Sequence, residues 1–392
     1  MPQSLNSILN LPDYEVMSVE GHDPVVITAR HVGGVHCPAC GGVSLRKKDR
    51  FVRRLHHESI GVRRCFLQLE AGKYHCLACD RYFHQRFPGV LPYRRSTEGY
   101  RREIFVQHRD GICQTQLARR GGIGTATVER WFQDLLGRKL AERQSAVCPR
   151  VLGIDEHFFS RKEGYATTLC DLEHHRVYDV VLGRSETALA GYFQQLREPE
   201  RVRVVCMDLS SPYRALARRF FPNARIVADR FHVVRLVSQA FLQVWKQLDP
   251  VGGQNRGLLG LMRRHAWTLK PIQALRMQDY LATRPALALI YDFKQRLVRL
   301  LLIKHRTYRQ CRRLVELLLH YIAYLRASPL DAFQTLGATL HSWQNEVACM
   351  WRFTKNNGIT EGFHTKMEMI SRRAYGFRNF QNYRLRVRVL CA

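Results

Sequence analysis

Two cysteine pairs have the spacing that most directly predicts chemistry. Each has the form Cys-x-x-Cys, and they are Cys37 with Cys40 and Cys76 with Cys79. Such a unit can form a tight turn that offers two thiolates to one ion, and two units complete a tetrahedral zinc site. A turn-forming Gly or Asp follows each pair directly. We therefore expect one structural Zn²⁺ bound by all four cysteines.

Two alternatives to this zinc site remain open. Three nearby histidines could replace one thiolate, namely His36, His75 and His84. The cysteines could also be small core residues or a redox pair, as cysteines elsewhere in proteins often are. We prefer the four cysteines because their paired spacing already completes the ligand set.

Acidic residues are scarce in this chain, so those that follow apolar strands stand out. Asp155 ends the run 151–154, and Asp208 ends the run 202–207. Carboxylates at the ends of neighbouring buried strands can share divalent cations, and their oxygens suit Mg²⁺ and Mn²⁺. Two such ions carry out phosphodiester chemistry. The alternative is that each Asp caps a turn or helix. Glu156 would point to the opposite face of its strand.

A third acid could come from the last part of the chain. Glu361 follows Thr360, which could cap a helix beginning near 355–358. Glu368 is seven residues further on and shares the same helical face, about 10 Å along the axis. Only one of them can reach a given metal pair, and periodicity does not choose between them.

The elements that would position the two aspartates are expected between residues 151 and 247. Strands are predicted at 151–155, 165–170, 176–182, 202–208 and 224–228, and helices at 186–196 and 212–221. Asp229 ends the last strand, and a long helix is expected to follow it. This order predicts one mixed sheet with helices on its faces. Residues 250–350 are rich in Leu and Arg and are expected to be entirely helical.

The N-terminal part should be a small β module followed by helices. Strands are predicted at 25–28 and 66–69, in a region that we expect to lack a core of its own and to gain folding energy from metal. Residues 95–145 should be helical, and 114–131 have the rhythm of a helix-turn-helix, with Leu117 in the first helix. An ordinary helical hairpin is the alternative. The candidate DNA contacts on the second helix are Thr125, Thr127 and Arg130.

The composition points to a polyanionic partner. The formal net charge is +29, from 62 Lys and Arg against 33 Asp and Glu, and nucleic acid is the usual partner of such a chain. A basic protein without such a partner is the alternative; a membrane-surface role would need one basic amphipathic helix. We expect no transmembrane helix and no signal peptide. The 12 cysteines should then be reduced, which favours a cytoplasmic, nucleoid-associated protein.

The sequence resembles bacterial DDE transposases of the insertion-sequence L-three (ISL-three) family over nearly its whole length. Besides the cysteine pairs and the helix-turn-helix, three blocks carry the resemblance. They are Gly153–Glu156; Met207–Tyr213 with Pro222–Ala224 and Asp229–His232; and Asn357–Gly358 with Glu361–Gly362 and Arg372–Phe380. Family members often have Asn shortly after the Glu-Gly pair, whereas His364 occupies that neighbourhood here.

The resemblance implies a multidomain α/β protein with an RNase H-like catalytic domain. Asp155, Asp208 and Glu361 would be its catalytic triad and hold two Mg²⁺ or Mn²⁺ ions, so the resemblance selects Glu361 over Glu368. Asp229 and His232 match a D-x-x-H signature that would contact DNA or support the site, although they could equally cap a helix and pack against the sheet. The implied domains are a zinc-binding module (1–92), a helix-turn-helix domain (93–147), the first part of the core (148–246), an all-helical insertion (247–350) and the last part of the core (351–392).

The function implied is DNA transposition. The protein would bind double-stranded terminal inverted repeats and target DNA as a homodimer or larger assembly, and would cleave and transfer DNA strands. Arginines expected along the DNA backbone are Arg372, Arg373, Arg378, Arg384, Arg386 and Arg388, some of which could form a solvated face instead. The alternatives are a transposase-derived regulator without catalysis, an RNase H-like nuclease or resolvase, and a serine or tyrosine recombinase, which would not need these acids.

Overall fold

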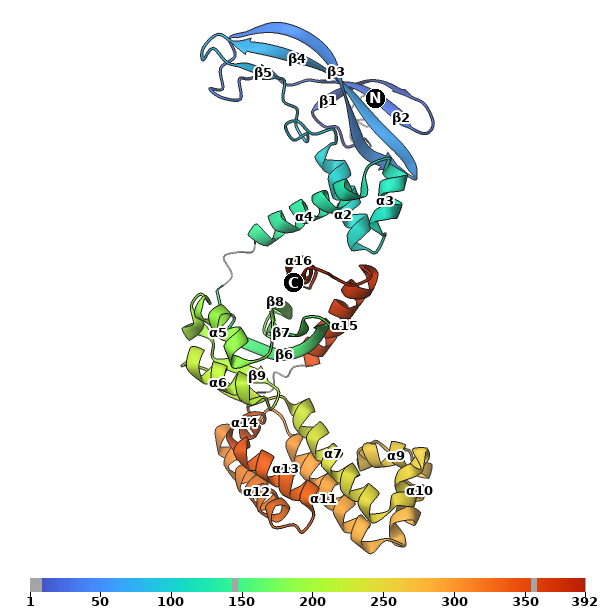
Figure 1. Cartoon of the computed structure of the whole chain (residues 1–392), viewed down its shortest axis with the longest axis vertical. Helices are drawn as coiled ribbons and strands as arrows, with labels where there is room; N and C mark the ends of the chain where they lie inside the picture. The colour runs from blue at the N-terminus through green and yellow to red at the C-terminus, as the bar shows by residue number, and fades with distance from the viewer. Residues whose placement is uncertain (1–8, 143–146, 354–357, 392) are drawn as a thin grey trace. The chain divides into compact units, whose positions relative to one another are not determined.

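The chain folds into two compact units, Met1–Ala141 and Glu142–Ala392 (Figure 1). We analysed a computed structural model, which describes residues 9–142, 147–353 and 358–391. Each unit contains one β-sheet and its own helices. No helix in these three ranges is both long and apolar enough to cross a membrane.

The N-terminal unit is built on a five-stranded sheet of order β1-β2-β4-β3, with β5 paired to β4. The strands are β1 (Tyr14–Glu20), β2 (Val25–His31), β3 (Leu45–Ile60), β4 (Arg63–Cys76) and β5 (Tyr82–His84). Only β2 and β4 pair in parallel. Both predicted strands are confirmed, as parts of β2 and β4.

This sheet has a hydrophobic core, so the prediction that the region lacks one is wrong. Every second residue of β2 and of the middle of β4 is buried, as expected for strands with one buried face. Ile27, Leu67 and Leu69 are completely shielded from solvent and pack with Leu55 and Phe87. The core arises because long-range pairing aligns apolar positions that are far apart in the sequence.

Three helices complete the N-terminal unit, as predicted for residues 95–145. They are α2 (Glu98–Arg109), α3 (Gln114–Gly121) and α4 (Thr125–Ala141). Gly122 directly follows α3, and its positive φ of 62° allows the chain to turn toward α4 within three residues. Leu117 of α3 shares a hydrophobic cluster with Val128 and Trp131 of α4.

The second unit contains the predicted mixed sheet, of order β10-β9-β6-β7-β8. Its strands are β6 (Val151–Ser160), β7 (Gly164–Asp171), β8 (Arg176–Leu182), β9 (Val204–Met207) and β10 (Arg225–Ala228). β6, β7 and β8 pair antiparallel, whereas β9 and β10 run parallel to β6. The parallel strands therefore bring their carboxyl ends to one edge.

Helices cover both faces of this second sheet (Figure 1). On one face, α5 (Glu186–Gln194) and α6 (Ser211–Phe220) share a core with Ile154 and Met207. On the other, α15 (Gly358–Arg373) and α16 (Phe380–Leu390) pack Met367 and Tyr383 against Cys170. The sheet is thus the middle layer of three.

The segment between β10 and α15 contains helices and the turns that join them, with no strand in its described residues, as predicted. It comprises α7 (Arg230–Leu248), α8 (Pro250–Gln254), α9 (Arg256–Arg263), α10 (Pro271–Ala282), α11 (Pro285–Leu301), α12 (Tyr308–Arg326), α13 (Asp331–Ser342) and α14 (Gln344–Cys349). Arg230 at the start of α7 is buried and donates to the carbonyl oxygens of Leu301, Ile303 and Met350. This side chain therefore ties the helical segment to the end of β10.

Candidate metal centres

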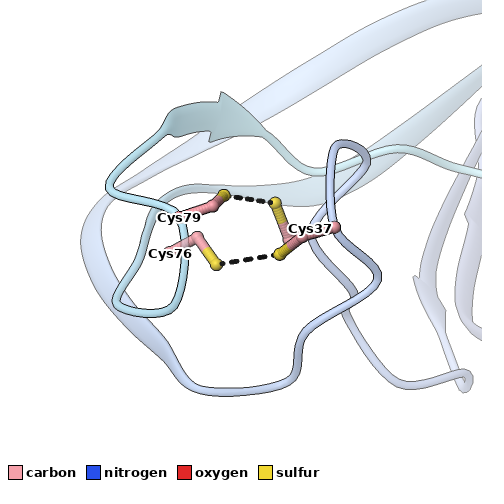
Figure 2. Close-up of side chains that lie close together, drawn as sticks. Cys37, Cys76 and Cys79 are labelled. Carbon is pink, nitrogen blue, oxygen red and sulfur yellow. Dashed lines mark hydrogen bonds between the residues drawn. The ribbon is translucent and has the colours of Figure 1, made fainter.

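The four paired cysteines form one cluster in the N-terminal unit (Figure 2). The sulfur atoms of Cys37 and Cys79 are 3.6 Å apart, as are those of Cys40 and Cys76, and all four lie within 4.8 Å of one another. Tetrahedral zinc with Zn–S bonds of about 2.3 Å requires sulfur atoms about 3.8 Å apart. The four thiols therefore fit one Zn²⁺.

Local backbone geometry shapes each cysteine turn. Gly41 and Asp80, directly after the pairs, both have positive φ, at 73° and 55°. Gly tolerates this conformation, and Asp adopts it more readily than most residues. Backbone N–H groups of Ala39 and Cys40 lower the pKa of the Cys37 thiol to about 6. That turn thus favours the thiolate that zinc needs.

The nearby histidines do not join the cysteines. His75 bonds to Asp80 across 2.6 Å, and the ring of His84 packs against Phe51. The cysteines are the only cluster of three or more metal-ligating side chains in the described ranges, and neither these histidines nor His36 belong to it. The four-cysteine ligand set is therefore the one that the geometry favours.

The acidic residues of the second unit lie at the edge where its parallel strands end. Asp208 directly follows β9, as predicted. Asp155 does not end its strand, because β6 continues to Ser160; it follows Ile154, which forms the last pair of the β6–β9 ladder with Met207. Asp155 therefore lies at the point where β6 and β9 stop pairing, next to Asp208 at the end of β9.

Asp229 joins the same edge, because it follows Ala228, which pairs with Met207 of β9. Asp229 is at the N-cap position of α7, but its side chain makes no capping bond. Its Oδ2 is instead 2.8 Å from Nδ1 of His232, and this hydrogen bond raises the pKa of His232. This bond thus favours the protonated form of His232 beside the acids.

Burial makes the ionised form of Asp155 and Asp208 unfavourable when no positive charge is nearby. It raises the pKa of Asp155 to about 7 and that of Asp208 to about 6; His232 opposes both increases, and Asp229 adds to them. Oδ1 of Asp208 is buried without a hydrogen-bond partner among the described residues. A bound cation would satisfy this atom and favour both ionised forms. The donor set therefore suits a hard divalent ion.

Glu361 is not brought into a ligand cluster with these two aspartates. It lies exposed in the first turn of α15, and residues 354–357 just before the helix, which include the predicted Asn357, lie outside the described ranges. His364, one turn further on, is the α15 residue that approaches the site. Its Nδ1 is 3.9 Å from Oδ2 of Asp155. The start of α15 thus lies beside β6 while Glu361 faces solvent.

A polar chain beside Asp155 was missed by the sequence analysis. Oγ1 of Thr168 is 3.1 Å from Nε2 of His364 and 2.9 Å from Nδ1 of His157, whose Nε2 is 2.9 Å from the hydroxyl of Tyr383. Burial lowers the pKa of His157 to about 3 and that of His364 to about 4, so both rings are neutral. The one sequence signal was that His157 shares a strand face with Asp155.

The two remaining acids considered from the sequence have arginine partners. Glu156 is 3.3 Å from Arg184, although it also contributes to the raised pKa of Asp208. Glu368 is exposed and pairs with Arg372 at 2.6 Å. Neither forms a ligand cluster with Asp155 or Asp208.

The candidate DNA contacts lie mostly on exposed surfaces. Thr125 and Arg130 are exposed at the start of α4, and Arg130 donates to Thr127, which is half-buried. Arg372, Arg373 and Arg378 are exposed at the end of α15 and in the loop after it.

The three arginines of α16 have internal roles. Arg384 bonds to both carboxylate oxygens of buried Asp179, and Arg388 approaches the same carboxylate at 3.4 Å. Arg386 is buried against the ring of Phe377. These side chains hold α16 in place, so they are not part of the DNA surface that we propose below.

Comparisons with known proteins match both units. A family model described as a transposase, DDE_Tnp_ISL3, matches residues 152–387. A second, described as the zinc-finger of transposase IS204/IS1001/IS1096/IS1165, matches residues 34–79, which include all four clustered cysteines. The transposase for insertion sequence element IS1001 of Bordetella parapertussis is 23% identical over 366 residues, covering 90% of this chain and 87% of that protein.

Proposed function

Because this chain belongs to the ISL3 family of transposases, we propose that it moves an insertion sequence by metal-dependent DNA cleavage and strand transfer. In this proposal it binds the terminal inverted repeats of the element. The observation that carries the proposal is the acidic edge of the second sheet, where buried Asp155 and Asp208 have raised pKa values. Such carboxylates are suited to holding divalent cations.

The fold supports an RNase H-like assignment for the second unit. Three antiparallel strands followed by two parallel ones, with helices on both faces, agree with the architecture that the family resemblance implies. The helices after β10 would be the insertion in that domain. In the N-terminal unit, the tight turn between α3 and α4 supports a helix-turn-helix, with Thr125, Thr127 and Arg130 on the helix facing DNA.

The proposed mechanism assigns a role to each side chain of the acidic edge. Asp155 and Asp208 would hold two Mg²⁺ or Mn²⁺ ions, which would supply activation of the attacking water or 3′-hydroxyl and charge stabilisation for the leaving oxygen. The Thr168–His157–Tyr383 chain would hold the His364 ring beside Asp155, and His232, held by Asp229, would place a positive charge near the DNA phosphate when protonated.

Glu361 completes the triad in this proposal. It precedes His364 by one turn, so a small displacement of the first turn of α15 on binding metal and DNA would bring its carboxylate toward the acidic edge. Exposed Arg372, Arg373 and Arg378 would contact the DNA backbone. Two DNA ends must meet for joining, so we expect a homodimer or larger assembly on DNA.

The test is a strand-transfer assay with pre-cleaved element ends and Mg²⁺ or Mn²⁺. Asp155→Ala, Asp208→Ala and Glu361→Ala should each lower the joining rate at least about a thousandfold, as removal of a catalytic group does. Glu368→Ala is the matched control from the same helix and should join at the parent rate. If any of the first three joined at that rate, its catalytic assignment would be wrong. A parent protein that binds the repeats but never joins them would instead be a regulator.

A further inference from the structure

The N-terminal unit carries a groove that the proposed catalytic reaction does not use. Its volume is about 660 Å³, and its walls come from residues 51–55 of β3, residues 81–86 and residues 90–95, beside the first cysteine turn. The segment 90–95 is fixed against β3, because Arg53 donates to the carbonyl of Arg94 across 2.7 Å and the carbonyl of Arg95 accepts from the His56 amide. The groove is therefore built by packed elements.

The groove is strongly positive. Six arginines line it and no carboxylate does, among the residues that the structure describes there: Arg53, Arg54, Arg81, Arg86, Arg94 and Arg95. Arg81, Arg86, Arg94 and Arg95 are exposed. In the same described ranges, none of these four has an acidic side chain within salt-bridge distance. Unpaired guanidinium groups around one groove are suited to a row of phosphates.

Aromatic rings lie among these charges. Tyr82 is 58% exposed and Tyr93 is 95% exposed, and both line the groove. Tyr93 has a φ of 59°, in the left-handed region that a bulky residue rarely adopts. Such strained residues concentrate at functional sites. The exposed Tyr93 ring is free to stack on a flat partner.

Amide side chains, which read adenine in a duplex, are scarce in the groove. Gln85 is its only amide side chain among the described lining residues, and its Oε1 already accepts from the backbone N–H of Gly72. Sequence readout in a duplex relies on paired hydrogen bonds to base edges, whereas sequence-tolerant binding of single strands combines basic grooves with aromatic stacking. The exposed Tyr82 and Tyr93 rings among these arginines therefore favour an unpaired strand, whose bases are open to stacking.

We propose that this groove binds an unpaired DNA strand, with Arg81, Arg86, Arg94 and Arg95 on its phosphates and Tyr82 and Tyr93 stacked on its bases. The inference rests on the proposed function for its choice of DNA, since cleavage of the two strands at staggered positions leaves an unpaired end. It assigns the groove a task separate from the duplex recognition expected of α4.

The test measures binding of the full-length, zinc-loaded protein without Mg²⁺ or Mn²⁺, so that no cleavage occurs. The probes are a fluorescent mixed-sequence single strand of about 16 nucleotides, the upper site size of such modules, and a duplex of the inverted repeat. Tyr93→Ala should weaken single-strand binding about 5- to 150-fold, the effect expected for losing one base stack. Tyr93→Phe should retain binding, and duplex affinity should stay unchanged.

A second measurement tests the arginines. Arg94→Gln should reduce the slope of log affinity against log salt concentration for the single strand by about 0.7, the value for one lost phosphate contact. Tyr308→Ala, a comparably exposed tyrosine on α12, is the matched control and should change nothing. Parent-like single-strand affinity in Tyr93→Ala and Tyr82→Ala would overturn the inference, as would an equal loss of duplex binding. If the parent protein still joins DNA strands, either of these results overturns the groove inference alone and leaves the proposed function standing.

Discussion

At the residue scale, Asp155 and Asp208 are held where negative charge is unfavourable. Desolvation raises both pKa values, and Asp229 adds to the effect. In the unfolded chain these carboxylates are solvated and ionise without this desolvation cost. Each aspartate therefore destabilises the folded state at pH values where it is ionised. A cation at the acidic edge would offset this cost, which links metal binding to the stability of the second unit.

This linkage predicts how an uncharged replacement behaves. Below pH 3.8, the ordinary pKa of Asp, the Asp155 carboxyl is protonated in both the folded and the unfolded protein. As pH rises from there through the folded-state pKa of about 7, the unfolded state ionises more readily and the folded protein loses stability. Asp155→Asn should therefore raise the free energy of unfolding of the protein free of Mg²⁺ and Mn²⁺ by up to about 4 kcal/mol above that pH, since burial raises the pKa from 3.8 to about 7 and each pKa unit is worth about 1.4 kcal/mol. Calorimetric melting against pH measures it.

The control for this prediction is Glu368→Gln, an exposed acid of α15 whose replacement should leave the melting temperature unchanged at every pH. Added Mg²⁺ should reverse the order and stabilise the parent over Asp155→Asn. A variant that melts below the parent at neutral pH without Mg²⁺ would contradict the assignment of Asp155 as a destabilising buried carboxylate.

At the element scale, strand bounds and strand pairing depend on different information. The alternation of β8 predicts its bounds, residues 176–182, as the structure has them. For β6, the apolar run 151–154 predicts a strand that ends at Asp155, yet β7 extends its pairing to Ser160. Hydrophobic runs report burial, whereas a strand continues wherever a neighbour supplies hydrogen bonds.

The last helix shows the same limit. Its sequence alternates Arg with apolar residues, and the structure uses Arg384 and Arg388 to neutralise Asp179 on β8. A lone sequence cannot show that two of these arginines face a buried acid about 200 positions away. The hydroxyl of Tyr192 donates to the same carboxylate, so α16 is anchored to β8 by a small polar network.

Removing the main partner of Asp179 should therefore destabilise the second unit. Arg384→Ala should cost about 3 kcal/mol of unfolding free energy, the lower end of the range for breaking a buried ion pair, because Arg388 remains. Denaturant unfolding measures it. Arg378→Ala, an exposed arginine in the loop before α16, is the control and should stay within about 0.5 kcal/mol of the parent. Equal stability of the two variants would show that the pair does not anchor α16.

At the scale of the whole molecule, the chain is two compact units with separate cores. The cysteine cluster belongs to the first unit alone, where it joins the turn after β4 to the turn before β3. The core around Ile27, Leu67 and Leu69 does not include the clustered cysteines. Zinc should thus stabilise one end of this sheet more than its centre.

Zinc removal tests this division. A strong chelator should speed amide hydrogen exchange in residues 70–84, near the cysteines, by opening that end of β4 and β5. Exchange in β6 and β9 should not change, and exchange at Leu67 should change less than at Tyr74. Replacing Cys113, which lies outside the cluster, with Ser is the control and should leave zinc content unaltered. Uniform loss of protection across both units would contradict the independence of the two units.

Local pattern alone determined several properties of this protein: the basic net charge, the paired cysteines, and the order of strands and helices in the second unit. Each depends on composition or on spacing within a few residues. Tertiary structure decided which side chains meet. Pairing of Ile154 with Met207 brings Asp155 to Asp208, and packing of α15 brings His364 rather than Glu361 toward Asp155. Periodicity reports which face of an element is buried, but register and packing against distant elements set what that face contacts.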